Sequence, residues 1–154
     1  MTTLKPKDKA PVITTTDQDG NKVSLKDFKG KKVALYFYPH DDTETCTKEA
    51  CNLRDNYALL KQKGIEILGV SIDDEKSHKK FVKKYSLPFT LLVDSDKKIV
   101  KNYGVWGEKL FMGKIIVSTY RTTFLINEKG KIDHIIEKVL SGKHAQQIIE
   151  TWGL

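Results

Sequence analysis

The hydrophobic pattern of the chain predicts strands that alternate with helices. Lys32–Tyr38 and Ile65–Ile72 are continuous apolar runs, which are typical of strands buried on both faces of a sheet. Between them, Thr43–Lys63 carries apolar residues three or four positions apart, and these line one face of a long helix that ends at Gly64. The apolar residues of that face are Ala50, Leu53, Tyr57 and Leu60.

The second half of the chain continues this pattern. Lys76–Tyr85 is amphipathic and predicts a helix, and Thr90–Val93 predicts a third strand. Thr122–Asn127 and Lys131–Glu137 predict a hairpin, because turn residues separate two apolar segments. Lys143–Trp152 predicts a closing helix.

The N-terminal segment predicts a separate hairpin. Val12–Thr15 and Lys22–Ser24 flank Asp19-Gly20, a hairpin-type turn signal. Leu25–Phe28 follows as a short helical turn, which Ser24 is suited to cap. The whole pattern predicts one α/β domain over residues 1–154, with a mixed central sheet and helices on both of its faces.

Composition changes this picture little. The chain has 154 residues, of which 39% are hydrophobic and 31% are charged, as in a globular protein. A net charge of +7 raises the alternative of a basic protein that binds nucleic acid. Only Arg54 and Arg121 are arginine, the residue that nucleic-acid sites favour, and the lysines are scattered. We therefore expect a solvated lysine surface and no nucleic-acid partner.

The beginning of the chain and its longest apolar run indicate a compartment. The first residues contain no apolar core of a signal peptide, and Val33–Tyr38 is far shorter than a membrane span. We expect a cytoplasmic protein with no membrane contact. In a reducing cytoplasm a lasting disulfide is not expected, so Cys46 and Cys51 are either inert or working thiols.

The segment from Pro39 to Cys51 joins a buried strand to the long helix, which is where functional groups gather in such sheets. Cys46 falls in the first turn of that helix, where free N–H groups and the helix dipole favour a thiolate. It also lies four residues before Ala50. We therefore expect its sulfur to point toward the sheet.

Cys46 and Cys51 cannot form a disulfide across an intact helix. Five residues of ideal helix separate their Cα atoms by about 8.6 Å. A disulfide requires Cα atoms within roughly 4.4–6.8 Å of each other. If this pair is redox-active, the helical turn must unwind for the bond to form.

This segment resembles the peroxiredoxins. Pro39, Thr43 and Cys46 match the pattern Pro-x-x-x-Thr-x-x-Cys, and Cys51 matches the bacterioferritin comigratory protein (peroxiredoxin Q) subfamily. The resemblance continues through Tyr103–Glu108 and into the segment after Arg121. It implies a thioredoxin-like fold and the reduction of hydrogen peroxide or organic hydroperoxides by thiols, with no metal or flavin cofactor. It also implies a thioredoxin-type dithiol reductant, and we expect a monomer, with a weak dimer as the alternative.

The same resemblance implies a role for each matching residue. Cys46 corresponds to the peroxidatic cysteine, and Cys51 corresponds to the resolving cysteine that condenses with its sulfenic acid. Thr43 corresponds to a threonine that contacts thiolate and peroxide. Arg121 corresponds to the arginine that stabilises the thiolate and the departing oxygen.

Two further matches concern the peroxide pocket. Pro39 corresponds to a proline that shields the pocket, and Glu49 to a glutamate that orients the arginine. One departure is the Glu44-Thr45 pair, where the subfamily commonly has Pro-Gly. Loss of a proline at a first-turn position removes preorganisation and changes how readily the turn unwinds.

The alternative functions and the remaining candidate residues have simpler interpretations. One alternative function is that of a thiol–disulfide oxidoreductase. Such enzymes use Cys-x-x-Cys, whose two cysteines are closer together than Cys46 and Cys51. This function would also give Thr43 and Arg121 no role. His40 lies near the cysteines, but a structural zinc site takes four ligands. We expect the three other histidines to lie at the surface. We expect the three large apolar residues before Arg121 to lie in the core, with a pocket wall or a partner surface as the alternatives. The former are His78, His134 and His144, and the latter are Trp106, Phe111 and Met112.

Overall fold

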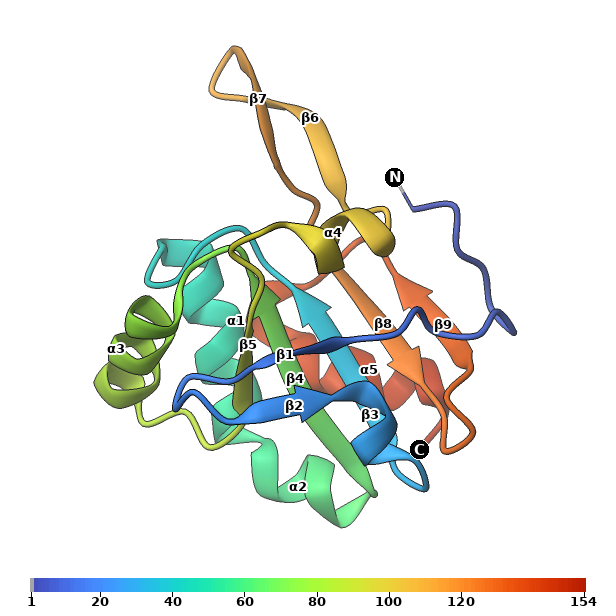
Figure 1. The fold of residues 1–154 in the computed structure, drawn as a ribbon. Helices are drawn as coiled ribbons and strands as arrows, with labels where there is room; N and C mark the ends of the chain where they lie inside the picture. Colours follow the sequence, from blue (N-terminus) through green and yellow to red (C-terminus); the bar gives the residue numbers. More distant parts are fainter. Residues whose placement is uncertain (1) are drawn as a thin grey trace.

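A computed structural model describes residues 2–154, which are built around a five-stranded sheet (Figure 1). The strand order is β5-β4-β3-β8-β9, with β3, β4 and β5 parallel to one another and β8 antiparallel to both β3 and β9. The predicted mixed sheet is therefore confirmed. The strands are β3 (Lys32–Phe37), β4 (Ile65–Ser71), β5 (Thr90–Val93), β8 (Thr122–Ile126) and β9 (Ile132–Ile136).

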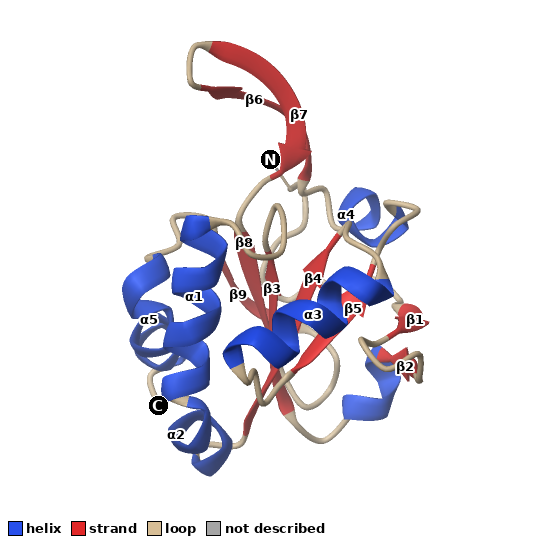
Figure 2. Ribbon diagram, turned by 90° about the vertical axis from the view of Figure 1, so that its left-hand side faces the viewer, coloured by secondary structure: helices blue, strands red, loops and turns tan. Residues whose placement is uncertain are grey.

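Successive side chains of the central strand β3 point to two different layers, as strand geometry requires. Ala34 and Tyr36 enter a core under the helices, while Val33 and Leu35 enter a second core on the opposite face. Figure 2 shows α1, α2 and α5 on the first face and the N-terminal hairpin with α4 on the second, with α3 beside β5. The helices are α1 (Glu44–Asp55), α2 (Tyr57–Gln62), α3 (Glu75–Tyr85), α4 (Lys98–Asn102) and α5 (His144–Trp152). Within residues 2–154, no helix is both long enough and apolar enough to cross a membrane.

The N-terminal hairpin is formed as predicted, with its first strand starting two residues later. Strand β1 (Thr14–Thr16) pairs antiparallel with β2 (Lys22–Ser24). The Asp17 carboxylate closes the turn, because it accepts hydrogen bonds from the backbone N–H groups of Asp19 and Asn21. The following 3₁₀ turn, η1 (Leu25–Phe28), has Ser24 at its N-cap, as expected.

The prediction of one long helix over Thr43–Lys63 is wrong in one respect. The segment is divided into α1 and α2 at Asn56, whose φ of −111° and ψ of 11° lie outside the helical range. The Asn56 side chain donates back to the carbonyl oxygen of Asn52 (2.9 Å), a local bond that competes with helical pairing. The apolar face runs through the break, and Leu53 and Leu60 are both fully buried.

A second hairpin is absent from the sequence prediction. Strands β6 (Trp106–Phe111) and β7 (Lys114–Thr119) pair antiparallel and project away from the body (Figure 1). The expectation that its apolar residues lie in the core is wrong for Phe111 and Met112, which are 56% and 86% exposed. Trp106 is half-buried against the second core. A two-stranded ribbon has no sheet face that must be buried, so large apolar side chains on it remain exposed.

Candidate active site

The site lies where β3 ends and α1 begins. Cys46 is in the first turn of α1, 1% exposed, and packs in the same core cluster as Tyr36 and Ala50. The predicted inward direction of its sulfur is therefore confirmed. Cys46 and Cys51 are free thiols on one uninterrupted helix, and Cys51 is half-buried. Disulfide formation therefore requires this helix to open.

Sheet pairing brings the second key side chain to Cys46. Strands β3 and β8 are antiparallel, and Phe37 at the end of β3 pairs with Thr122 at the start of β8. Arg121 therefore lies beside the end of β3, although it is 75 residues from Cys46 in the sequence. Its Nη2 donates to the Cys46 sulfur at 3.2 Å.

The same guanidinium also holds Glu49. Arg121 Nη1 donates to Glu49 Oε1 at 2.6 Å, so one planar side chain bridges the sulfur and a carboxylate. Burial lowers the pKa of Arg121, but the charges of Glu49 and Cys46 outweigh burial and raise it. Arg121 thus remains a cation in a largely enclosed position.

Glu49 lies in an environment that disfavours its charge. Its side chain is fully buried. Burial raises the pKa of Glu49 to about 7, although the charge and hydrogen bond of Arg121 act to lower it. Protonated and ionised Glu49 are therefore both populated near neutral pH.

His144 on α5 lies behind Glu49 and is fully buried, so the expectation of a surface residue is wrong. Its Nδ1 lies 2.9 Å from Gln147 Oε1. That oxygen also accepts from the backbone N–H of Leu140, while Gln147 Nε2 donates to the carbonyl of Lys138. The amide orientation is thereby determined, so His144 Nδ1 carries the proton. Burial lowers the pKa of His144 to about 4, which keeps the ring neutral.

The other ring nitrogen of His144 faces Glu49. Nε2 lacks a proton in this tautomer and accepts a hydrogen bond from Thr123 Oγ1 (2.7 Å). Glu49 Oε2 lies 3.6 Å from Nε2 and has no hydrogen-bond partner among the described residues. This distance is too long for a hydrogen bond, and a neutral ring forms no ion pair. An ionised Oε2 would face a lone pair, which is a second reason for Glu49 to retain a proton.

The loop between β3 and α1 holds the remaining predicted residues. Thr43 is the N-cap of α1, and its exposed hydroxyl donates to the carbonyl oxygen of His40 at 3.2 Å. Pro39 is half-buried directly after β3. The structure thus brings Cys46, Glu49 and Arg121 into direct contact, whereas the Thr43 hydroxyl is bonded within its own loop.

A buried ion pair anchors this loop, and sequence reasoning missed it. Asp41 Oδ2 accepts from His78 Nδ1 (2.7 Å) and Ser77 Oγ (2.8 Å), and Tyr38 donates to Asp41 Oδ1 (2.6 Å). His78 Nε2 faces the carbonyl of Leu92 (2.8 Å), so both ring nitrogens face acceptors. His78 is fully buried, so its expected surface position is wrong. Its spacing of three residues from buried Phe81 on α3 was the available signal.

Burial and hydrogen bonding have opposite effects on the pKa of His78. Burial lowers its pKa, but the hydrogen bond and charge of Asp41 outweigh burial and raise it. The imidazolium form is therefore favoured, and a charged pair ties α3 to the loop that leads into Cys46.

A second cation reaches the site from the β6–β7 hairpin. Lys109 Nζ donates to the carbonyl oxygen of Thr119 at 3.3 Å. Burial and the charge of Arg121 lower the pKa of Lys109, while the charge of Cys46 acts to raise it. Lys109 thus lies in the middle of β6, where the charges of Arg121 and Cys46 both act on it.

Comparison with known proteins identifies this arrangement. Residues 6–135 match the model of the AhpC/TSA family. The chain belongs to this family. Peroxiredoxin Bcp of Escherichia coli K12 is 43% identical over 152 residues, covering 99% of this chain and 97% of that protein. A putative peroxiredoxin bcp of Coxiella burnetii is 47% identical over 141 residues, covering 92% and 93%.

Solved structures of peroxiredoxins agree with the fold. A cysteine-to-serine mutant of Xylella fastidiosa PrxQ superposes with a TM-score of 0.91 at 25% identity, covering 99% of this chain and 98% of that chain. The bacterioferritin comigratory protein of Xanthomonas campestris gives a TM-score of 0.86 at 27% identity, with the same coverage. The expected thioredoxin-like fold is confirmed, and the chain is a thiol-dependent peroxidase of the peroxiredoxin family.

Proposed function

We propose that this peroxiredoxin reduces hydrogen peroxide and organic hydroperoxides with Cys46 as the attacking thiolate and Cys51 as the resolving thiol. The observation that carries the proposal is the 3.2 Å contact of Arg121 Nη2 with the Cys46 sulfur. A permanent cation at this distance favours the thiolate and lies within reach of a peroxide bound at the sulfur. A relative from Xanthomonas campestris is described in terms of alkyl peroxide reduction, which supports the substrate class.

In the first step, the Cys46 sulfur attacks one oxygen of a hydroperoxide. A sulfur–oxygen bond forms as the O–O bond breaks, and the hydroxyl proton stays on the transferred oxygen. Cys46 becomes a sulfenic acid, and the other oxygen departs as hydroxide or alkoxide, which takes a proton from solvent. Arg121 offsets the negative charge that moves from sulfur to the departing oxygen, and the roles of Thr43 and Pro39 as pocket residues belong to this step.

In the second step, the Cys51 sulfur attacks the sulfenic sulfur and water leaves. This step requires the N-terminal part of α1 to unwind. The part after Cys51 is held in place, because Asn52 donates to the Gly142 carbonyl (3.0 Å) and accepts from the Ala145 N–H (2.8 Å). We therefore propose that the opening is confined to residues 44–51.

The cycle closes when a dithiol protein reduces the disulfide. We propose a thioredoxin-type reductant, since unwinding exposes the Cys46–Cys51 bond to an external thiolate. The reductant is oxidised to its own disulfide, and both cysteines return as thiols. The contacts among Cys46, Glu49 and Arg121 lie within one chain, which supports a monomer as the catalytic unit.

The decisive experiment pairs peroxide consumption, with thioredoxin and its reductase as donor, with intact mass after one equivalent of peroxide. The wild type should turn over, and its mass should fall by two hydrogen atoms. Cys46→Ser should abolish peroxide consumption, and Cys51→Ser should complete one turnover and stop at the sulfenic acid. Full steady-state turnover of Cys51→Ser with thioredoxin would refute the resolving role.

A further inference from the structure

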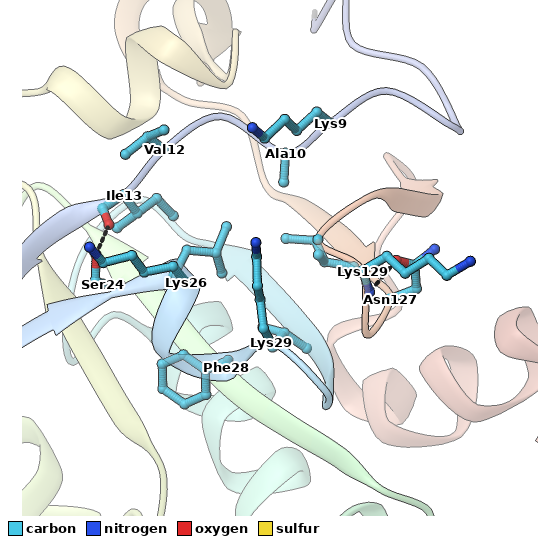
Figure 3. A pocket seen from close by; sticks show the side chains of 14 residues that line it. Lys9, Ala10, Val12, Ile13, Ser24, Lys26, Phe28, Lys29, Asn127 and Lys129 are labelled. Carbon is cyan, nitrogen blue, oxygen red and sulfur yellow. Dashed lines mark hydrogen bonds between the residues drawn. The ribbon is translucent and has the colours of Figure 1, made fainter.

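A cavity of about 250 Å³ lies outside the candidate active site, and Cys46 is not among its lining residues (Figure 3). Its lining comes from three segments: the chain before β1, the η1 turn with its flanking residues, and the turn between β8 and β9. Val33 at the start of β3 and Ile126 at the end of β8 form part of it. Since Cys46 follows the opposite end of β3, the cavity is separate from the site of the proposed peroxide chemistry.

Backbone hydrogen bonds connect the segments that line the cavity and fix their positions relative to one another. Ala10 N–H donates to the carbonyl of Gly130 (3.0 Å), and Leu25 N–H donates to that of Ile13 (3.1 Å). Gly30 N–H donates to the carbonyl of Glu128 (2.9 Å). Each bond joins two different segments, so the cavity is set by the backbone and does not depend on flexible side chains alone.

The inner surface of the cavity is apolar. Ala10, Ile13, Val33 and Ile126 are all buried, and each lines the cavity. The Ala10 methyl group points into the space (Figure 3). Val12, which is 77% exposed, extends the apolar surface to the mouth. Contact with an apolar chain would remove this surface from water.

The charged residues that line the cavity all have the same sign. Four of the 14 lining residues are lysines and none is acidic. These are Lys9, Lys26, Lys29 and Lys129. No side-chain ion pair or hydrogen bond of their amines is found among residues 2–154, whereas neighbouring Lys32 is paired with Glu128. Figure 3 shows the Lys29 side chain extending toward the segment that carries Ala10.

We propose that this cavity binds an amphipathic anion, with a short acyl chain on the apolar floor and a carboxylate among the lysines. An apolar cavity of about 150 Å³ accommodates benzene, which corresponds to roughly 25 Å³ for each non-hydrogen atom. The present cavity therefore holds about ten such atoms, the size of octanoate. Inorganic anions lack the apolar part, and alcohols lack the charge, so both are poorer ligands.

The test is an amide NMR titration of the full-length reduced protein with octanoate, 1-octanol and octyltrimethylammonium in parallel. Octanoate should give saturable shifts at Ala10, Val33 and Ile126, and octanol should bind at least about twofold more weakly, which is the lower limit of what two exposed ion pairs contribute. Octyltrimethylammonium should give no shifts at the cavity. Equal binding of octanol and octanoate, or the absence of saturable shifts, would overturn the proposal.

Variants locate the site. The double variant Lys26→Gln/Lys29→Gln should raise the dissociation constant of octanoate by about twofold to thirtyfold, while Lys83→Gln on exposed α3 should leave it unchanged. Ala10→Leu should abolish binding by filling the floor, with circular dichroism to verify folding. If Ala10→Leu does not fold, the lysine variant decides. The proposed site would be refuted if octanoate shifted only the amide signals of hairpin residues 110–117. It would also be refuted if Lys26→Gln/Lys29→Gln and Lys83→Gln bound octanoate with equal affinity. Peroxidase activity of the cavity variants is measured separately. It tests the proposed function, whereas octanoate binding tests only the proposed ligand site.

Discussion

At the scale of single residues, Arg121 is the side chain that joins the candidate site together. It donates to Cys46 through Nη2 and to Glu49 through Nη1. Only a planar side chain with several N–H donors serves both partners at once. The proposed role of Cys46 thus depends on one contact between distant parts of the chain.

Arg121→Gln should slow the oxidation of Cys46 by about 100-fold or more, which is typical of losing one such electrostatic donor. The rate constant for oxidation of Cys46 in Arg121→Lys should lie between those of the wild type and Arg121→Gln, because one ammonium cannot reproduce both contacts. The measurement is the second-order rate constant with hydrogen peroxide in single-turnover stopped flow. Arg54→Gln is the matched control, since Arg54 bonds Asp55 and the Tyr85 carbonyl, and it should change the rate less than about twofold. An unchanged rate in Arg121→Gln would contradict the assignment.

Glu49 and His144 make opposite contributions to the pH dependence of stability. The pKa of Glu49 is raised from 4.5 to about 7, so its contribution is present below pH 4.5 and is lost as pH rises to 7. The pKa of His144 is lowered from 6.5 to about 4, so its contribution is present above pH 6.5 and is lost as pH falls to 4. The two contributions therefore oppose each other between these limits.

Glu49→Gln removes the contribution of Glu49 to the pH dependence of stability and leaves that of His144. The difference in unfolding free energy between wild type and Glu49→Gln should fall as pH rises from 4.5 to 7, by on the order of 1–3 kcal/mol. Urea denaturation at a series of pH values measures it. Glu150→Gln, at an exposed position of α5, should give a curve parallel to the wild type. A parallel curve for Glu49→Gln as well would show that Glu49 does not titrate in this range.

At the scale of elements, α1 combines a firmly held half with the half that we propose to open. Asn52 ties the part after Cys51 to the segment that leads into α5. At the other end, the Thr43 side chain makes no capping hydrogen bond to α1. The first turn therefore lacks a stabilising bond that many helices have, which favours the unwinding that the two cysteines require.

Glu44 is the first residue of α1, a position that accepts proline. Glu44→Pro should stabilise the closed turn by about 0.4–1 kcal/mol through reduced freedom of the opened chain. Disulfide formation should then slow by about twofold to fivefold, while peroxide attack at Cys46 keeps its rate. Rapid-quench mass spectrometry separates the two steps, and Glu44→Ala controls for the lost charge. Faster disulfide formation in Glu44→Pro would contradict this account of the first turn.

At the scale of the whole molecule, the β6–β7 hairpin is separated from both cores along most of its length (Figure 1). Leu110, Phe111 and Met112 are each more than half exposed. Its tip turn has positive φ at Met112 (51°) and Gly113 (80°), which favours Asn-Gly. Local stability of the hairpin should therefore vary independently of global stability.

Met112→Asn should slow amide exchange along β6 and β7 while the melting temperature stays within about 1–2 °C of the wild type. Asparagine suits the positive φ and removes an exposed apolar side chain. Gly113→Ala is the opposite control, because a Cβ at φ 80° is strained, and it should speed exchange in the same strands. A large shift in melting temperature in either variant would show that the hairpin is coupled to the core.

The sequence by itself determined the order of strands and helices, the inward direction of Cys46 and the need for α1 to open. These depend on local spacing, which periodicity and helix geometry encode directly. It did not determine the break at Asn56, the exposed hairpin or the burial of His144, since polar residues and a two-stranded ribbon carry no comparable periodic signal. The burial of His78 was also not predicted, although its spacing from Phe81 was compatible with it. Only the tertiary structure decided these.

Tertiary structure also decided the geometry of the site. The pairing of Phe37 with Thr122 brings Arg121 to Cys46 across 75 residues, and packing of α5 places His144 behind Glu49. Such contacts depend on strand register and on which helix covers which face, so they arise only when the whole sheet is assembled. Local pattern thus singled out Cys46 and Cys51 as candidates, and assembly of the sheet supplied the charges around Cys46.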